Sequence, residues 1–184
     1  MKNFFKGVPP ISNLYAAEEY KNEIINLLCQ NQNFIKLINP TSDLYKYVFD
    51  YDFTDDSLAE EKTFVFIDTD IDTIRDNMFT DFTLCVYVFT NKNLVNLNSS
   101  SVPTSKEVKD MGYFSTDTRG NRIGALCECI DRILNGSNLL WGIGDLRPAA
   151  ENHLSAYAPN KNYYGKCLKY TITNYNSGGD EFGN

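Results

Sequence analysis

The run FTLCVYVF at residues 82–89 is the feature that most limits the folds open to this chain. Both sets of alternating positions in it are apolar, whereas a strand with one face in water alternates apolar and polar residues. A strand over residues 81–90 is therefore predicted to lie centrally in a sheet, with cover on both faces. The β-branched and aromatic residues 63–67 predict an antiparallel neighbour, joined to it by a long linker over residues 68–80 that is rich in Asp and Thr.

Two amphipathic helices are predicted to supply the cover. Residues 14–30 and 121–135 both repeat apolar side chains at helical spacing, and Gly136 follows the second where a helix C-terminal cap belongs. A shorter helix is predicted over residues 33–38, because the position before Pro40 disfavours helix. An apolar helical stripe of this kind needs a sheet to cover it, since two helices packed only on each other would leave the strands bare.

The remaining strands are predicted at residues 139–146, where glycines interrupt the strand, and at residues 163–175, with a loop over residues 153–159. The fold class is therefore expected to be α+β: a small, mostly antiparallel sheet packed by two main helices, with an extended arm and a loop.

A length of 184 residues fits one domain. We expect an N-terminal arm over residues 1–13, a single α+β domain over residues 14–176 and a disordered tail over residues 177–184. Within the domain, residues 41–62 are expected to form an extended acidic and aromatic arm, and residues 91–117 a flexible loop rich in Ser.

The arm at residues 41–62 is marked by aromatic side chains at every second position. Period-two alternation predicts a strand or an extended hairpin arm with one aromatic face. The N-terminal arm is also expected to be extended, because Pro9 and Pro10 restrict the backbone. Both arms offer apolar anchors for neighbouring subunits. The candidate interface residues are Phe4, Phe5, Tyr45, Tyr47, Phe49, Tyr51 and Phe53.

The chain is acidic, with a formal charge of -7 and an isoelectric point near 4.7. This balance argues against a dedicated nucleic-acid binder, which carries a basic face. Many of the acidic residues lie in residues 50–72, where their carboxylates are either simply solvated at the surface or form a functional surface. No apolar stretch approaches the roughly 18 residues of a membrane span, and no signal-peptide pattern is found near the start, so synthesis in the cytosol without a membrane partner is expected.

No set of residues in the sequence defines a reaction, so no catalytic residue, metal or cofactor is predicted. His153, the one histidine, is expected to be a polar loop residue. The run Asp68-x-Asp70-x-Asp72 has the spacing that opens a calcium-binding loop, but it lacks the Gly and Glu that such a loop needs further on. The five cysteines are odd in number, widely spaced and set in apolar segments, which favours free thiols over a disulfide scaffold.

Three later segments carry a resemblance to a known family. They are the helix RIGALCECIDRILNGS at residues 122–137, the glycine-bearing WGIGDL at residues 141–146 and YYGKCLKY at residues 163–170. Following a leading helix, an acidic arm and two strands, they resemble the tail terminator (tail completion) family among the neck proteins of tailed bacteriophages. The resemblance spans about residues 14–176 and lies in the order of the elements.

This resemblance implies a structural virion protein, made in the cytoplasm of a host bacterium and without catalytic residues. Its copies would form a ring, usually a hexamer, that ends the tail tube and joins it to the head connector, so the implied partners are the tail tube protein and the connector or adaptor proteins. DNA would pass the lumen without specific binding, because an acidic lining repels phosphates. The lumen-facing candidates are Asp50, Asp52, Asp55, Asp56, Glu60 and Glu61.

Other functions stay open at this point. The long segment 41–62 and the Ser-rich residues 98–105 also suit another head–tail adaptor or a baseplate protein. A small metal-dependent enzyme using Asp68, Asp70 and Asp72 is a hypothesis of a different class, and a monomeric binding module is a third.

Overall fold

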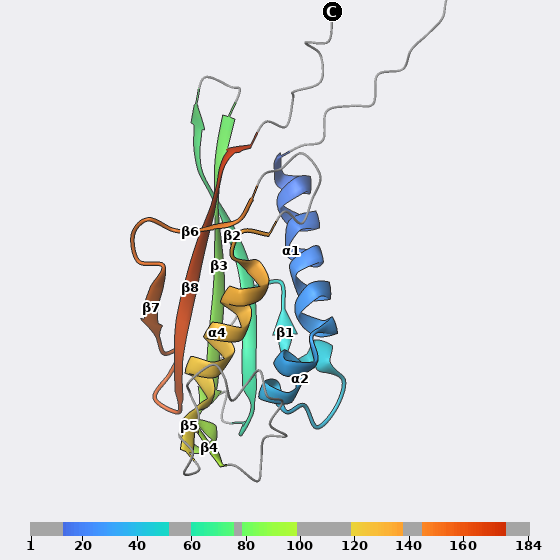
Figure 1. Ribbon diagram of the computed structural model, residues 1–184, viewed down its shortest axis with the longest axis vertical. Helices are drawn as coiled ribbons and strands as arrows, with labels where there is room; N and C mark the ends of the chain where they lie inside the picture. The colour runs from blue at the N-terminus through green and yellow to red at the C-terminus, as the bar shows by residue number, and fades with distance from the viewer. Residues whose placement is uncertain (1–12, 52–59, 76–78, 99–118, 138–144, 176–184) are drawn as a thin grey trace, which may run out of the picture.

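The computed structural model describes residues 13–51, 60–75, 79–98, 119–137 and 145–175, and a six-stranded sheet is its main element (Figure 1). Every strand pairing in this sheet is antiparallel except that of the first two strands, so the predicted α+β class with a mostly antiparallel sheet is confirmed. In spatial order the strands are β1 (Val48–Phe49), β2 (Thr63–Arg75), β3 (Phe79–Asn91), β8 (Tyr163–Tyr175) and β6 (Arg147–Pro148), with β7 (Leu154–Tyr157) also on β8. A separate pair joins β4 (Asn96–Asn98) to β5 (Arg119–Asn121).

Strand β3 occupies the centre of the sheet, between β2 and β8, as its two apolar faces predict. Its side chains Leu84, Val86 and Val88 point into the core beneath the helices, while Phe89 is buried on the opposite face. The predicted strand at residues 81–90 and its antiparallel pairing with residues 63–67 are both confirmed.

The prediction of a linker over residues 68–80 is wrong, because the antiparallel strands β2 and β3 continue through most of that segment. Strand β2 runs on to Arg75 and β3 begins at Phe79, with Ile71 paired to Phe82 and Ile74 paired to Thr80. The β-branched residues that alternate with the aspartates favour extended backbone. The aspartates favour a loop in the sequence pattern, but carboxylates are common on the solvated edge of a sheet.

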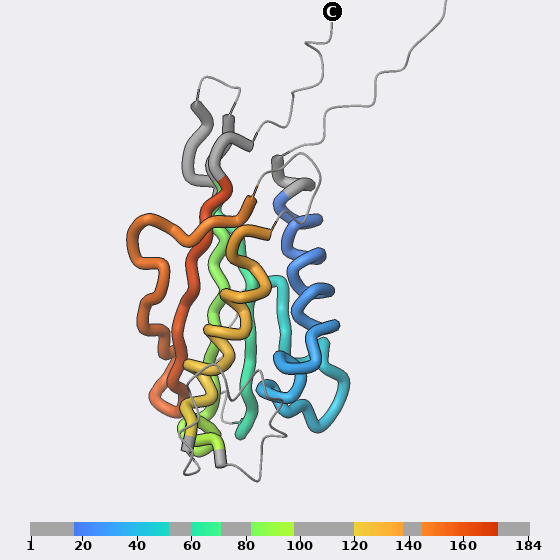
Figure 2. Tube along the Cα trace, in the orientation of Figure 1, coloured from blue at the N-terminus to red at the C-terminus, as the bar shows by residue number. Residues whose placement is uncertain are grey.

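In the part of the chain that the structure describes, one face of this sheet is covered by α1 (Asn13–Gln30), α2 (Gln32–Ile38) and α4 (Arg122–Leu134), close to their predicted bounds. Figure 2 shows α1 (blue) and α4 (yellow to orange) running along the same face. Asparagine side chains begin two of them, because a side-chain oxygen can accept from the first free N–H groups of a helix. Asn31 accepts from the amides of residues 33 and 34, and Asn121 from those of residues 123 and 124. Gly136, at φ 76, follows α4 as predicted.

The main core lies between these helices and the sheet. Ile24 and Leu28 of α1 and Leu126 and Ile130 of α4 are fully buried there. Each such side chain stabilises the fold by about 1.5–3 kcal/mol before conformational entropy is counted. The helix stripes and the sheet alternation therefore define one interior, as the sequence pattern requires.

Arg122, the first residue of α4, is buried beside this core. Its guanidinium donates to the carbonyl oxygen of Leu94 at 2.9 Å and to the carbonyl oxygen of Leu37 near the end of α2. Desolvation lowers the pKa of Arg122 from its usual value. This side chain joins three segments that lie far apart in the sequence.

Other predicted segments differ in part. Residues 153–159, expected as a loop, contain β7, which pairs with β8. Within residues 91–117, a 3-10 turn (Lys92–Leu94) and β4 replace part of the expected flexible loop, and residues 99–118 lie outside the described residues, as do residues 1–12 and 176–184. Of the strand expected at residues 139–146, only residues 145 and 146 are described, and they are not strand.

The prediction of an extended aromatic strand around residues 45–53 is also wrong for the described residues of that segment. Residues Leu44–Lys46 form a 3-10 turn that begins at Asp43, whose carboxylate accepts from the Tyr45 amide at 3.1 Å. Only Val48 and Phe49 are strand, and they pair in parallel with Val65 and Phe66. The alternation of aromatic residues does not distinguish this turn and short strand from an extended arm, because it gives the spacing of the side chains and not their burial.

Candidate interaction surface

The face of the sheet opposite α1, α2 and α4 carries a cluster of aromatic side chains. Phe66 and Phe89 meet edge to face with ring centroids 4.8 Å apart, and Phe64 lies 5.6 Å from Phe89. Such arrangements add about 0.5–1.5 kcal/mol per pair beyond area burial. The aromatic cluster consists of the buried Phe64, Phe66, Phe89 and Tyr163 and the half-buried Phe49, Tyr87 and Tyr157.

Tyr163 links this cluster to the residues that precede β2. Its hydroxyl donates to the carbonyl oxygen of Glu60 at 2.7 Å. Burial, and after it the charge of Glu60, raises the pKa of Tyr163 to about 12. The phenol is therefore held in its neutral form in the folded protein.

This pKa makes the unfolding free energy depend on alkaline pH. Since a tyrosine in the unfolded chain titrates near pH ~10, the buried Tyr163 contributes stability that is complete below that pH and is lost as pH rises through its folded pKa of about 12. We expect Tyr163→Phe to be less stable than wild type by about 1 kcal/mol at neutral pH, where a hydrogen bond is lost. Above pH ~10 the difference should shrink. Urea unfolding across this pH range measures it, and two parallel curves would contradict the assignment.

The free edge of β2 is the second part of the surface. Strand β1 pairs only with Val65 and Phe66, and among the described residues no strand pairs with the outer side of β2 from Ile67 to Arg75. Asp68 is half-buried and accepts from the Thr69 amide at 2.8 Å, whereas Asp70 is exposed. Charged side chains on an edge discourage uncontrolled strand pairing, while the unpaired backbone groups remain able to join a suitable strand. We call this stretch, residues 67–75, the acidic edge.

The described members of the lumen-facing acidic candidates lie near the start of β2. Asp50, Glu60 and Glu61 are all exposed. Glu60 pairs with Lys62, and Glu61 accepts from the Asn93 side chain at 2.6 Å. Asp52, Asp55 and Asp56 lie outside the described residues.

The aromatic interface candidates are divided between surface and interior. Tyr45 and Tyr51 are exposed, at 57% and 51%. Tyr47 is only 2% exposed, and its hydroxyl accepts from the Thr41 amide at 3.0 Å. Phe49 packs in the aromatic cluster, edge-on to Phe66 at 5.3 Å. Tyr47 and Phe49 thus serve the interior of the subunit. The remaining candidates, Phe4, Phe5 and Phe53, lie outside the described residues.

The aspartate run places two carboxylates on one side of a strand and forms no calcium loop. Asp68 and Asp70 alternate with β-branched residues along β2, and the side chain of Asp72 is not among those described. Within the described part of the chain, no three His, Cys, Asp or Glu side chains come close enough together to hold a metal ion.

His153 is part of a network that the sequence gave no reason to expect. Its Nδ1 donates to the Lys169 carbonyl oxygen at 2.7 Å, and its Nε2 lies 3.3 Å from Asp131 Oδ1. The same carboxylate oxygen accepts from the buried Tyr170 hydroxyl at 2.9 Å. These contacts join α4 to β8 and to the start of β7. Burial raises the pKa of the nearby Cys127 thiol to about 12, so the network has no activated thiol beside it.

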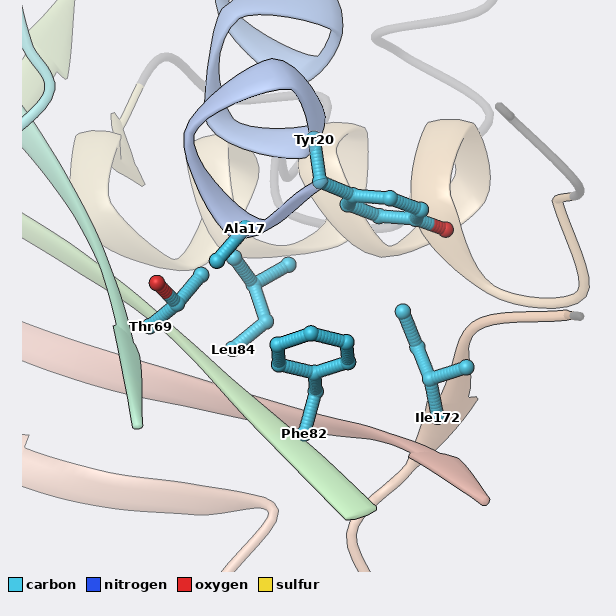
Figure 3. A pocket seen from close by; sticks show the side chains of 6 residues that line it. All are labelled: Ala17, Tyr20, Thr69, Phe82, Leu84 and Ile172. Atoms are coloured by element: carbon cyan, nitrogen blue, oxygen red, sulfur yellow. The ribbon is translucent and has the colours of Figure 1, made fainter. Parts of the chain in front are cut away.

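A cavity between α1 and the sheet is too small for a substrate. Figure 3 shows Tyr20 of α1 facing side chains of the sheet across it. Its volume is about 10 Å³, against roughly 300–1,000 Å³ for typical ligand pockets. Its lining residues are Ala17, Tyr20, Thr69, Phe82, Leu84 and Ile172.

These features define an α+β protein whose helices cover one face of an open sheet and whose β2 strand leaves an acidic edge. The chain belongs to the YomW family, whose model matches residues 21–172, and this membership indicates a phage-associated protein. Comparison with curated proteins and with solved structures finds no significant match. Among the described residues, no helix has the length and apolar character needed to cross a membrane.

Proposed function

We propose that this chain is a structural subunit of a phage particle whose copies close into a ring at the head–tail neck. The ring ends the tail tube and joins it to the head connector, and the subunit has no catalytic role. Family membership supports the phage setting. The open edges of the sheet support assembly, since an edge strand offers unpaired backbone groups to another strand.

The observation that carries the proposal is that the sheet ends in two different edges. The acidic edge of β2 carries Asp68 and Asp70. The opposite edge, at β6 and β7, has the exposed Arg147, paired with Asp145 at 3.4 Å, and the exposed Lys161 in the turn before β8. Contact between unlike edges joins copies head to tail, and that geometry makes a ring when the rotation closes.

The exposed acids near the start of β2 suit the lumen of such a ring. Asp50, Glu60 and Glu61 lie near β1 and the first residues of β2, away from the acidic edge that would contact a neighbour. Carboxylates there would repel phosphates, so DNA would pass without tight binding. The tail tube protein and the connector are the partners this role requires.

Native mass spectrometry of the purified chain tests the ring. We expect a closed homo-oligomer, with six copies as the resemblance to tail terminators implies. Asp70→Lys should weaken assembly by about tenfold in dissociation constant, because it reverses the charge of the acidic edge. Glu23→Lys makes the same change of charge on the exposed side of α1 and should assemble as wild type. Adding Lys161→Glu to Asp70→Lys should recover assembly.

Electron microscopy with purified tail tubes tests the position in the particle. We expect the protein at the tube end that meets the head. Binding at the opposite end would favour a baseplate role instead. A chain that stays monomeric at high concentration and never joins a tail tube would overturn the proposal.

A further inference from the structure

Two cysteine thiols face each other on the side of the sheet opposite α1, α2 and α4. In the register of β3 and β8, Cys85 lies opposite Lys169 and Tyr87 lies opposite Cys167. Cys85 and Cys167 are therefore diagonal neighbours on one face of the sheet. Both are 3% exposed, and their thiols hydrogen-bond to each other.

The surroundings give the two sulfur atoms different protonation. The hydrogen bond with Cys167, with smaller contributions from a hydrogen bond with Tyr87 and from the Lys169 ammonium, lowers the pKa of Cys85 despite burial and the charge of Asp70. The same hydrogen bond, together with burial, raises the pKa of Cys167. Cys85 is thus the more readily ionised thiol of the pair. The thiolate is the form of cysteine that reacts with oxidants.

We propose that Cys85 and Cys167 form an oxidation site, at which a small peroxide converts the two thiols into a disulfide between β3 and β8. The proposal does not depend on the function proposed above. The oxidant must be small, because neither sulfur is open to a bulky disulfide reagent. No other cysteine offers this arrangement: the pKa of Cys29 and that of Cys127 are raised, chiefly by burial. Cys127 and Cys129, two residues apart on α4, point to different sides of the helix.

The chemistry is a two-electron oxidation in two steps. The Cys85 thiolate attacks one peroxide oxygen, the O–O bond breaks and hydroxide leaves, so Cys85 becomes a sulfenic acid. Cys167 sulfur then attacks Cys85 sulfur, the S–O bond breaks, and hydroxide departs with the Cys167 proton as water. Each thiol gives up one electron and one proton overall, and one hydrogen peroxide is reduced to two waters.

Peptide mapping tests the site directly. The reduced, folded chain is treated with hydrogen peroxide, its remaining thiols are alkylated, and the digest is analysed by mass spectrometry. We expect a peptide pair joined through Cys85 and Cys167, lighter by two hydrogens than the two free peptides. Cys167→Ser should leave the Cys85 sulfenic acid without a partner, so that dimedone captures it when the oxidised chain is unfolded in urea. Cys127→Ser, which removes a thiol of α4, should form the disulfide as wild type.

Lys169→Met separates the reaction from a merely structural effect. Loss of the ammonium should slow oxidation of Cys85 by roughly threefold at neutral pH, since less of the thiol is ionised. Circular dichroism before oxidation verifies that each variant is folded. A disulfide that joins other cysteines, or a Cys85 that stays reduced while the half-buried Cys29 is oxidised, would overturn the proposal.

Discussion

Replacing Gly165 with alanine is expected to destabilise the fold by about 3 kcal/mol or more, at the upper end of what overpacking costs. A Cβ atom at this position of β8 would lie 2.5 Å from Phe89 Cβ and closer still to the Val88 carbonyl oxygen. Both atoms belong to the central strand β3, so neither can rotate out of the way. The β3–β8 pairing itself would have to shift beneath the aromatic cluster. Urea unfolding followed by circular dichroism measures the change.

Gly136→Ala is the matched control for this substitution. Gly136 has φ 76, and nothing lies within 4 Å of a Cβ built there. Its replacement should cost only about 1 kcal/mol, from the left-handed backbone that glycine adopts freely. Equal losses of stability in the two variants would show that the close approach of β3 is not the reason why glycine is needed at residue 165.

Arg122→Ala is expected to destabilise the protein by about 2–4 kcal/mol. The guanidinium satisfies the carbonyl oxygens of Leu37 and Leu94, and its removal leaves both acceptors buried and also leaves a cavity. The end of α2 and the 3-10 turn before β4 would lose their common anchor. Chemical denaturation should therefore show a lower midpoint, and hydrogen exchange should show faster opening near Leu37.

Arg132→Ala tests whether the loss of stability in Arg122→Ala comes from the buried position of Arg122 rather than from its charge. Arg132 lies on the same helix and pairs with Glu128 at 2.8 Å, but its side chain is largely in solvent. An exposed pair of this kind contributes about 0.3–0.5 kcal/mol. A similar loss for the two arginines would contradict the anchoring role of Arg122.

The elements that could be predicted from the sequence are those whose periodicity is carried by apolar residues alone. The two-faced run at residues 82–89 placed β3 at the centre of the sheet, and the stripe from Ile123 to Leu134 placed α4 on that sheet. The hairpin beyond Ile67 was missed because its aspartates suggested a loop. Composition does not show whether a polar residue lies in a turn or on the edge of a strand.

The surface was harder to predict because its partners are distant in sequence. The alternation that suggested an aromatic arm in fact sends Tyr47 and Phe49 to the interior. His153 was expected to be an ordinary loop residue, but it contacts Asp131 on α4 and the carbonyl of Lys169 on β8. The diagonal pair of Cys85 and Cys167 depends on the register of two strands, which no single segment of the sequence reveals.

The order of the strands along the chain sets an order for folding during synthesis. The hairpin of β2 and β3 is local in sequence, whereas the other side of β3 waits for β8, which is translated much later. Until then, the nascent chain holds β3 as an unpaired edge with Phe89 incompletely covered. Contacts between distant segments form slowly, and open apolar edges aggregate. Chaperone dependence during translation should therefore fall once residues of β8 have left the ribosome.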